Sequence, residues 1–272
     1  MFKDIKRNIK KKLVRERIVP VIIKDIQTNL LRGKTALISG GSSGIGYAIA
    51  KKIAESGGKV IILGSNENKL KQAAKQIEAD YLVANIKDID NLKVKIENLT
   101  PKTSIDILVN SAGTHGSGQF GSVTEEDWNS VMDVNLKGCY FLSQYISQYM
   151  IKNHIKGHIL NISSASSIKP GWTPYEISKR AVNGITLGFA HKLAPYGIIV
   201  NGLAPGPTGT PMLNFHNDET IDLTWSGNPT GRVSTVEEIA NLAIFMISDL
   251  GNGIVGDTFF MTGGSGTVCT DK

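Results

Sequence analysis

Short apolar segments alternate with longer amphipathic segments along this chain from residue 33 onward. Most of the apolar segments are nearly continuous in Ile, Val and Leu, which is typical of strands buried on both faces. These predicted strands lie at residues 35–39, 60–63, 81–83, 105–110, 157–162, 198–203 and 258–261. The predicted helices between them lie at residues 45–56, 67–77, 88–98, 124–152, 173–194 and 235–248. This alternation predicts an α/β fold, a doubly wound parallel sheet with helices on both faces, over residues 33–272.

Four loops that follow predicted strands contain the polar and glycine residues expected of a site. They are residues 40–46 after the first strand, 110–113 after the fourth, Ser163 and Ser164 after the fifth, and 205–210 after the sixth. In a doubly wound fold the ligand binds outside the carboxyl ends of the strands. We therefore expect the chemistry of this protein in these loops.

The first of these loops is rich in glycine and opens a predicted helix. Glycines permit a tight turn and a close approach of the backbone to a diphosphate, and the helix start offers free N–H groups and a partial positive charge. A plain glycine-rich turn is the alternative, but the position at the first strand-to-helix junction favours a nucleotide. The predicted nucleotide-binding residues are Gly40, Ser42, Ser43, Gly44, Ile45 and Gly46.

Tyr175 and Lys179 lie four residues apart in the predicted helix 173–194, so they are neighbours on its surface. An ammonium group fixed beside a phenol stabilises the phenolate and lowers the pKa of the tyrosine from its usual value of about 10. The tyrosine could then exchange a proton at cellular pH. This pair predicts an acid/base at Tyr175, although the same spacing alone also fits an ordinary exposed pair.

Five motifs in one order connect these features. They are the Gly-x-x-x-Gly-x-Gly turn, Asn110-Ser111-Ala112-Gly113, Asn135, Ser164 with Tyr175-x-x-x-Lys179, and Pro205-Gly206. In these motifs the chain resembles the short-chain dehydrogenase/reductase family, in its compact single-domain branch, and most of all the pattern of 3-oxoacyl-[acyl-carrier-protein] reductases. The resemblance covers residues 33–266. It implies a Rossmann-type sheet and hydride transfer between NAD(P) and a carbonyl or secondary alcohol.

The resemblance also implies a role for each residue of the reacting centre. Tyr175 passes a proton to or from the substrate oxygen, and Lys179 lowers its pKa and binds the nicotinamide ribose. Ser164 donates a hydrogen bond to the substrate oxygen, with Ser163 as the alternative. Asn135 marks a local helix distortion whose backbone carbonyl holds a water in a proton relay. A helix-packing asparagine is the other interpretation of Asn135.

Further cofactor contacts follow from the same resemblance. The adenosine and its ribose are expected beside Asn85, Ile86, Asn110, Ala112 and Gly113. The nicotinamide is expected beside Pro205, Gly206, Thr208 and Thr210.

The choice between NADP and NAD depends on the end of the second predicted strand. An enzyme that prefers NAD commonly has an Asp there for the ribose hydroxyls, and this chain has Gly64. Ser43, Ser65 and Asn66 stand where NADP enzymes usually place Arg, and their hydroxyl and amide groups can still bind a phosphate. NADP is therefore the predicted cofactor, ahead of NAD. Lys69 either adds a charge there or is a solvated helix residue.

The net charge of +6 is unevenly distributed. Residues 1–32 contain ten Lys/Arg and three Asp/Glu, whereas the other 240 residues contain 20 and 21. A near-neutral body indicates a small-molecule substrate and not nucleic acid, because nucleic-acid enzymes carry basic residues over the binding face.

Hydrophobic residues recur at helical spacing within the basic segment, which predicts an amphipathic N-terminal extension over residues 1–32. Three hypotheses stay open for this extension. It is an arm that packs on another subunit, a contact with a membrane surface or an acidic partner, or a solvated tail.

Cysteine and histidine usage indicates the compartment and the absence of a metal. Cys139 and Cys269 are too few for a disulfide framework and suit a reducing compartment. The first residues lead into charge and not into the apolar core of a secretory signal, so we expect a cytoplasmic protein. The five histidines do not combine with cysteines or carboxylates at ligand spacing, so we expect no metal site.

Residues 207–232 show few regular signals and match the substrate lid of the family. A 3-oxoacyl-type reductase is the leading hypothesis. The alternatives are a sugar or polyol dehydrogenase, whose lid would use His216, Asn217 and Asp218, and a cofactor-binding scaffold or sensor with little turnover. The resemblance further implies a homodimer or homotetramer that uses the last strand, where Phe259 and Phe260 are contact or core residues.

Overall fold

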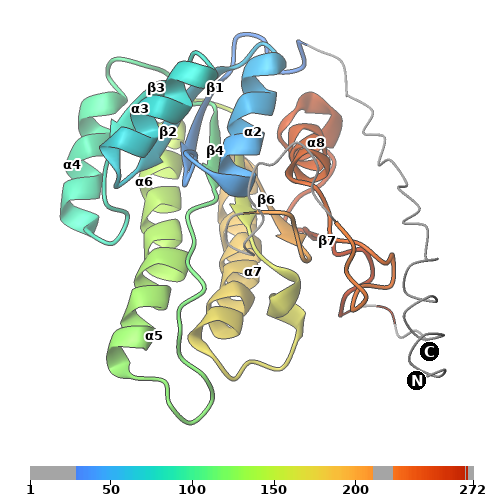
Figure 1. Cartoon of the computed structure of the whole chain (residues 1–272). Helices are drawn as coiled ribbons and strands as arrows, with labels where there is room; N and C mark the ends of the chain where they lie inside the picture. Colours follow the sequence, from blue (N-terminus) through green and yellow to red (C-terminus); the bar gives the residue numbers. More distant parts are fainter. Residues whose placement is uncertain (1–28, 211–222, 267, 269–272) are drawn as a thin grey trace, which may run out of the picture.

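The computed structural model describes residues 29–210, 223–266 and 268. At its centre lies one seven-stranded sheet in the order β3-β2-β1-β4-β5-β6-β7, and all neighbouring strands are parallel (Figure 1). The strands are β1 (Thr35–Ser39), β2 (Lys59–Gly64), β3 (Asp80–Val83), β4 (Ile107–Asn110), β5 (His158–Ile162), β6 (Ile199–Pro205) and β7 (Thr258–Met261). All seven predicted strands are present, and the predicted doubly wound fold is confirmed.

Helices cover both faces of this sheet. They are α2 (Gly44–Glu55), α3 (Glu67–Gln76), α4 (Ile89–Leu99), α5 (Glu125–Met132), α6 (Cys139–Lys152), α7 (Pro174–Leu193) and α8 (Val236–Ile247). Buried residues of α2, α3 and α8 form one core with the sheet, and those of α4, α6 and α7 form the other.

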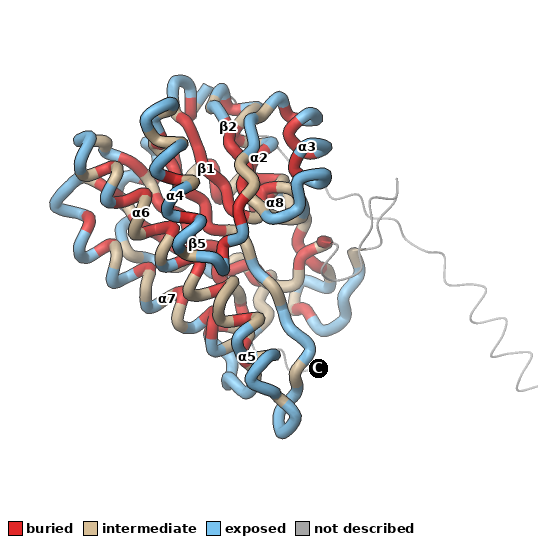
Figure 2. The backbone as a smooth tube through the Cα atoms, turned by 90° about the vertical axis from the view of Figure 1, so that its left-hand side faces the viewer, coloured by how far each residue is buried: buried red, intermediate tan, exposed pale blue. Residues whose placement is uncertain are grey.

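Side chains alternate between these two cores along the strands. In β1, Ala36 and Ile38 lie in the first core and Leu37 lies in the second. Successive residues of a strand point to opposite faces of the sheet, so strands that are apolar throughout fill both cores. Figure 2 shows buried residues along the strands and exposed residues on the outer sides of the helices.

The predicted helix over residues 124–152 is not continuous. A π-helical segment, η1 (Asp133–Gly138), separates α5 from α6. A side chain at Gly138 would begin 2.5 Å from Cγ1 of Ile86, so η1 lies directly against the segment that follows β3. The prediction of one continuous helix was therefore wrong in its middle, where the chain is π-helical, at the place where the resemblance implied a distortion.

The strand order reverses at β1, which pairs with β2 on one side and with β4 on the other. Crevices form at such a switch point, outside the carboxyl ends of the strands. The loops after β1, β4, β5 and β6 all reach this edge, and the loop after β5 contains the 3₁₀ helix η2 (Ala165–Ile168). Two further 3₁₀ helices, η3 (Ala194–Tyr196) and η5 (Asp249–Gly251), follow α7 and α8.

Candidate active site

The glycine-rich turn is held against the loop after β4. Gly40 has φ +69°, and a side chain there would begin 2.8 Å from the Cα of Ala112. A side chain at Gly46 would collide with the carbonyl oxygen of Gly40. Ser43 is extended before α2, and no side-chain cap binds the N–H groups at the helix start. The close backbone approach and the uncapped start of α2 fit the diphosphate of a dinucleotide.

The loop after β6 lies next to this turn. A side chain at Gly44 would begin 3.7 Å from Cγ2 of Thr210, which is a buried residue. The hydroxyl of Thr208 donates a hydrogen bond to the carbonyl of Gly206 at 2.9 Å. Gly206 lies close to the backbone of Thr262, and a side chain there would begin 2.7 Å from its Cα. The structure thus brings the predicted nicotinamide loop and the predicted diphosphate turn together.

The predicted adenosine residues lie after β2 and β3. Ser65 and Asn66 are exposed, and the Asn66 side chain caps α3 by accepting a hydrogen bond from the backbone N–H of Lys69 at 3.0 Å. Asn85 is exposed and accepts from the N–H of Lys87 at 3.1 Å. Ile86 is buried in the core. These two hydrogen bonds hold the loops after β2 and β3. They use only the side-chain oxygens, and among the described residues the amide N–H groups of Asn66 and Asn85 make no hydrogen bond.

The side chain of Asn110, a residue predicted beside the adenosine, points into the interior of the protein. It is buried and donates hydrogen bonds of 2.8 Å to Ser143 Oγ and to Asn161 Oδ1. Asn161 in turn donates to Thr186 Oγ1 at 2.9 Å. The Asn110 side chain therefore links β4 to α6 and β5 inside the protein, and Asn161 extends this link to α7. Only the backbone of Asn110 can border a nucleotide.

Lys179 lies at the centre of the site. It is 6% exposed, and its Nζ donates a hydrogen bond to the carbonyl of Ile162 at 2.9 Å. A side chain at Gly113 would begin 3.6 Å from Lys179 Nζ and 3.5 Å from Asn135 Oδ1. Lys179 Nζ lies 5.9 Å from the ring centroid of Tyr175. The loops after β4 and β5 therefore meet α7 and η1 at one point.

Burial shifts the pKa values of both residues of the predicted acid/base pair. It lowers the pKa of Lys179 to about 8. It also raises the pKa of Tyr175, and a hydrogen bond with Ser164 opposes that rise only in part. The expected lowering of the Tyr175 pKa by Lys179 is thus wrong for the polypeptide by itself, because desolvation is the largest influence on the phenol.

The two serines after β5 have different surroundings. Ser164 forms a hydrogen bond with Tyr175, and its Oγ accepts from the N–H of Ser166 at 3.1 Å. Ser163 is buried, and its Oγ lies 2.5 Å from Asn183 Oδ1 and 3.2 Å from the carbonyl of Lys179. Ser163 thus fastens α7 to the sheet, and Ser164 faces the tyrosine.

Asn135 lies within η1, so the predicted helix distortion at this residue is confirmed. Its side chain also makes hydrogen bonds that the sequence did not predict. Asn135 Oδ1 accepts from the N–H of Thr114 at 2.8 Å, and its Nδ2 donates to the carbonyl of Thr114 at 2.9 Å. Nδ2 also lies 3.1 Å from Ser178 Oγ. The asparagine therefore clamps the loop after β4 at a single residue.

His115 is a site residue that the sequence reasoning missed. Its imidazole stacks on the phenol ring of Tyr175, with ring centroids 4.3 Å apart and an interplanar angle of 26°. The available signal was its position two residues beyond Gly113, in a loop at the carboxyl end of a strand.

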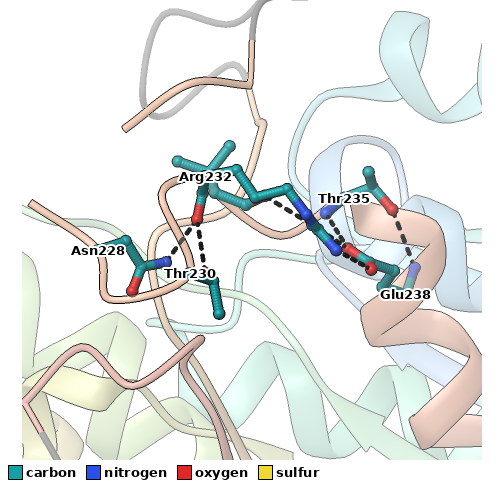
Figure 3. A network of polar contacts seen from close by, with 6 residues as sticks. Asn228, Thr230, Arg232, Thr235 and Glu238 are labelled. Atoms are coloured by element: carbon teal, nitrogen blue, oxygen red, sulfur yellow. Dashed lines mark hydrogen bonds and ion pairs between the residues drawn. The ribbon is translucent and has the colours of Figure 1, made fainter. Parts of the chain in front are cut away.

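The predicted lid over residues 207–232 lies partly outside the described residues, as do His216, Asn217, Asp218 and most of the predicted N-terminal extension. Figure 3 shows the described stretch that precedes α8. Arg232 donates two hydrogen bonds to the Glu238 carboxylate, at 2.8 and 2.7 Å. Asn228 and Thr230 donate hydrogen bonds to the Arg232 carbonyl (Figure 3). Ser234 forms an isolated β-bridge with Thr208. Both ends of the predicted lid are thereby tied together.

Among residues 29–210 and 223–268, apart from 267, no group of three or more His, Cys, Asp or Glu side chains is arranged to hold a metal ion. Within the same residues, no helix has the length and apolar character needed to cross a bilayer.

The same chain matches known proteins over most of its length. A family model described as enoyl-(acyl carrier protein) reductase matches residues 40–266. The chain is 36% identical over 242 residues to the 3-oxoacyl-[acyl-carrier-protein] reductase of Thermotoga maritima. The aligned region covers 86% of this chain and 98% of that protein. The chain belongs to the short-chain dehydrogenase/reductase family. It is therefore an NAD(P)-dependent oxidoreductase.

Other members of the family show how varied the substrates are. The chain is 34% identical over 244 residues to a 3α-hydroxysteroid dehydrogenase of Mediterraneibacter gnavus, with 86% of this chain and 97% of that protein covered. A crystal structure of a gluconate 5-dehydrogenase from Burkholderia cenocepacia, in complex with NADP and tartrate, is 32% identical. The two structures superpose with a TM-score of 0.80, and the match covers 88% of this chain and 97% of the gluconate 5-dehydrogenase chain.

Proposed function

We propose that this short-chain dehydrogenase/reductase prefers NADP and acts on a carbonyl or secondary alcohol, with Tyr175 as the proton donor or acceptor. The observation that carries the proposal is the hydrogen bond between Ser164 and Tyr175 beside buried Lys179. The two hydroxyl groups, one from the loop after β5 and one from the first turn of α7, are close enough to bond to each other, so a single substrate oxygen can contact both. This point of contact lies at the carboxyl edge of the sheet, near the glycine-rich turn.

The side chains divide the chemistry between them. When bound, the nicotinamide supplies or accepts the hydride. Ser164 donates a hydrogen bond to the substrate oxygen and stabilises the negative charge that develops on it during reduction. Tyr175 then donates its proton to that oxygen, and its raised pKa keeps the proton on the phenol at neutral pH. Lys179 contributes positive charge below its pKa of about 8.

The preference for NADP is supported by the residues after β2. Gly64 brings no carboxylate to the ribose hydroxyls, and the exposed Ser65 hydroxyl and Asn66 amide N–H group lie at the start of α3. Exposed Lys69 lies in the first turn of the same helix. A helix start with hydroxyl, amide and ammonium groups favours a phosphate over two neutral hydroxyls. The related gluconate 5-dehydrogenase was solved with NADP.

Two substrate classes are supported by the relatives. The first is a 3-oxoacyl thioester, because the Thermotoga maritima relative is a 3-oxoacyl-[acyl-carrier-protein] reductase at 36% identity. The second is a sugar acid or polyol, because the gluconate 5-dehydrogenase has a TM-score of 0.80. We place the acyl thioester first.

A homo-oligomer in the cytoplasm completes the proposal. Phe259 and Phe260 are 36% and 37% exposed on β7, the edge strand of the sheet, so they are not core residues. An edge strand with exposed aromatic side chains favours burial against a second copy of the chain. The N-terminal extension stays a proposed contact with a subunit, an acidic partner or a membrane surface.

Loss of NADPH absorbance in the presence of the full chain tests this function. The carbonyl panel should contain acetoacetyl thioesters, simple ketones and keto sugar acids, and each compound should be tried with NADPH and with NADH. We expect turnover of at least one class, with kcat/KM higher for NADPH than for NADH. Tight NADPH binding without turnover of any compound would favour the scaffold instead, and a higher kcat/KM with NADH would overturn the cofactor preference.

A further inference from the structure

The imidazole of His115 has no role in the proposed function so far, although it touches the proposed proton donor. It covers the Tyr175 ring at a centroid distance of 4.3 Å, and the side chain is exposed. Within the part of the chain that the structure describes, neither ring nitrogen of His115 has a hydrogen-bond partner. An exposed donor beside a reacting group is available to a ligand.

The fold positions His115 from both sides. The preceding residue, Thr114, is clamped by Asn135 through two hydrogen bonds of 2.8 and 2.9 Å. The following residue, Gly116, has φ +74°, and a side chain there would begin 2.6 Å from Cγ2 of Val131 on α5. The backbone is thus fixed before His115 and pressed against α5 after it. The ring lies on the tyrosine because the loop holds it there.

A substrate must pass close to this ring. Its reacting oxygen has to contact both Tyr175 and Ser164, which are themselves hydrogen-bonded to each other. A ring stacked 4.3 Å from the phenol centroid borders the carbon atoms next to that oxygen. An apolar neighbour would gain only contact area there, whereas an oxygen atom could accept a hydrogen bond from the imidazole.

We propose that His115 is a specificity-determining residue that donates a hydrogen bond to a second oxygen of the substrate, a carbonyl or hydroxyl oxygen one or two carbons from the reacting carbon. The inference rests on the proposed function and narrows its substrate class. It favours 3-oxoacyl and polyhydroxy substrates, which carry such an oxygen, over simple ketones, which do not. A site built to donate a hydrogen bond discriminates against an analogue that lacks the acceptor.

Paired probes separate this role from a purely structural one. Ethyl 3-oxobutanoate is compared with 2-hexanone, and 3-hydroxy-2-butanone with 2-butanone, using the full chain and NADPH. His115→Phe keeps an aromatic ring on Tyr175 but has no N–H group, and His115→Gln keeps an N–H group without an aromatic ring. His191→Gln, at an exposed histidine near the end of α7, is the matched control.

The ratio of kcat/KM within each pair is the readout. We expect His115→Phe to lower the preference for the oxygenated compound about tenfold, mainly through KM, because one neutral hydrogen bond is lost. The plain ketone should stay within about threefold of the parent, since the change removes nothing that it contacts. His115→Gln should keep most of the preference, and His191→Gln all of it.

Two results would overturn the inference while leaving the proposed function intact. One is an unchanged ratio in His115→Phe, and the other is an equal loss for both members of a pair, which indicates a structural role for the ring. Failure of the full chain to reduce any probe would instead contradict the proposed function, and this inference with it.

Discussion

At Tyr175, burial and hydrogen bonding act on the pKa in opposite directions. Desolvation raises the pKa of the phenol, and the hydrogen bond with Ser164 lowers it. Burial also lowers the pKa of the Lys179 ammonium to about 8, so the lysine loses its positive charge above that pH. Near neutral pH both groups are protonated, because the pKa of the phenol is raised and the lowered pKa of the ammonium, about 8, still lies above neutral. This state suits donation of a proton to a substrate that is being reduced.

The buried ammonium of Lys179 leads to a prediction about stability and pH. Its pKa falls from an ordinary 10.5 to about 8 on folding, so the unfolded chain binds more protons between those values and stability rises with pH there. Below pH 8 the charged form carries the full burial penalty, on the order of 3 kcal/mol. We expect the gain in unfolding free energy from Lys179→Met to be largest below pH 8 and to shrink towards pH 10.5.

Urea denaturation at several pH values measures that difference. Lys192→Met, at an exposed lysine in the last turn of α7, controls for general effects of alkaline pH. A difference between Lys179→Met and the parent that stays constant from pH 7.5 to 10.5 would contradict the shift.

At the scale of elements, η1 connects two parts of the site. It widens the helix between α5 and α6 and aims Asn135 at the loop after β4. The sequence predicted the distortion only through the family resemblance, because the apolar spacing runs through residues 124–152 without a break. The contacts that define it, from Asn135 to Thr114 and from Gly138 to Ile86, join residues far apart in the chain. Periodicity reports only local spacing, so it could not locate them.

Asn135→Ala tests this connection. It leaves the backbone N–H and carbonyl of Thr114 without their partner, and we expect a loss of about 1–3 kcal/mol in the free energy of unfolding. Turnover should fall as well, since the loop that holds His115 is released. Denaturant unfolding and NADPH oxidation measure the two effects. Asn68→Ala, at an exposed position of α3, is the control. Stability and turnover both equal to the parent would argue against the clamp.

At the scale of the whole molecule, the sequence was sufficient to predict the sheet and the edge of the sheet at which the candidate site lies. Apolar strands and the loops after them carry their own local signal, so all seven strands and the meeting of the four loops could be predicted. Side-chain directions could not be predicted, because they depend on contacts across strands. Asn110 turns into the interior towards Ser143, and His115 turns out onto Tyr175.

Replacement of the phenol hydroxyl tests the central claim, that Tyr175 transfers the proton. NADPH oxidation and NADPH binding are measured for Tyr175→Phe and for Tyr196→Phe, which loses a hydroxyl at an exposed tyrosine in η3. The account predicts that Tyr175→Phe loses about 10²- to 10⁴-fold in kcat/KM on the best carbonyl of the panel. Its Kd for NADPH should stay within about threefold of the parent, and Tyr196→Phe should be unchanged. A Tyr175→Phe protein that keeps turnover within a few-fold of the parent would contradict the account.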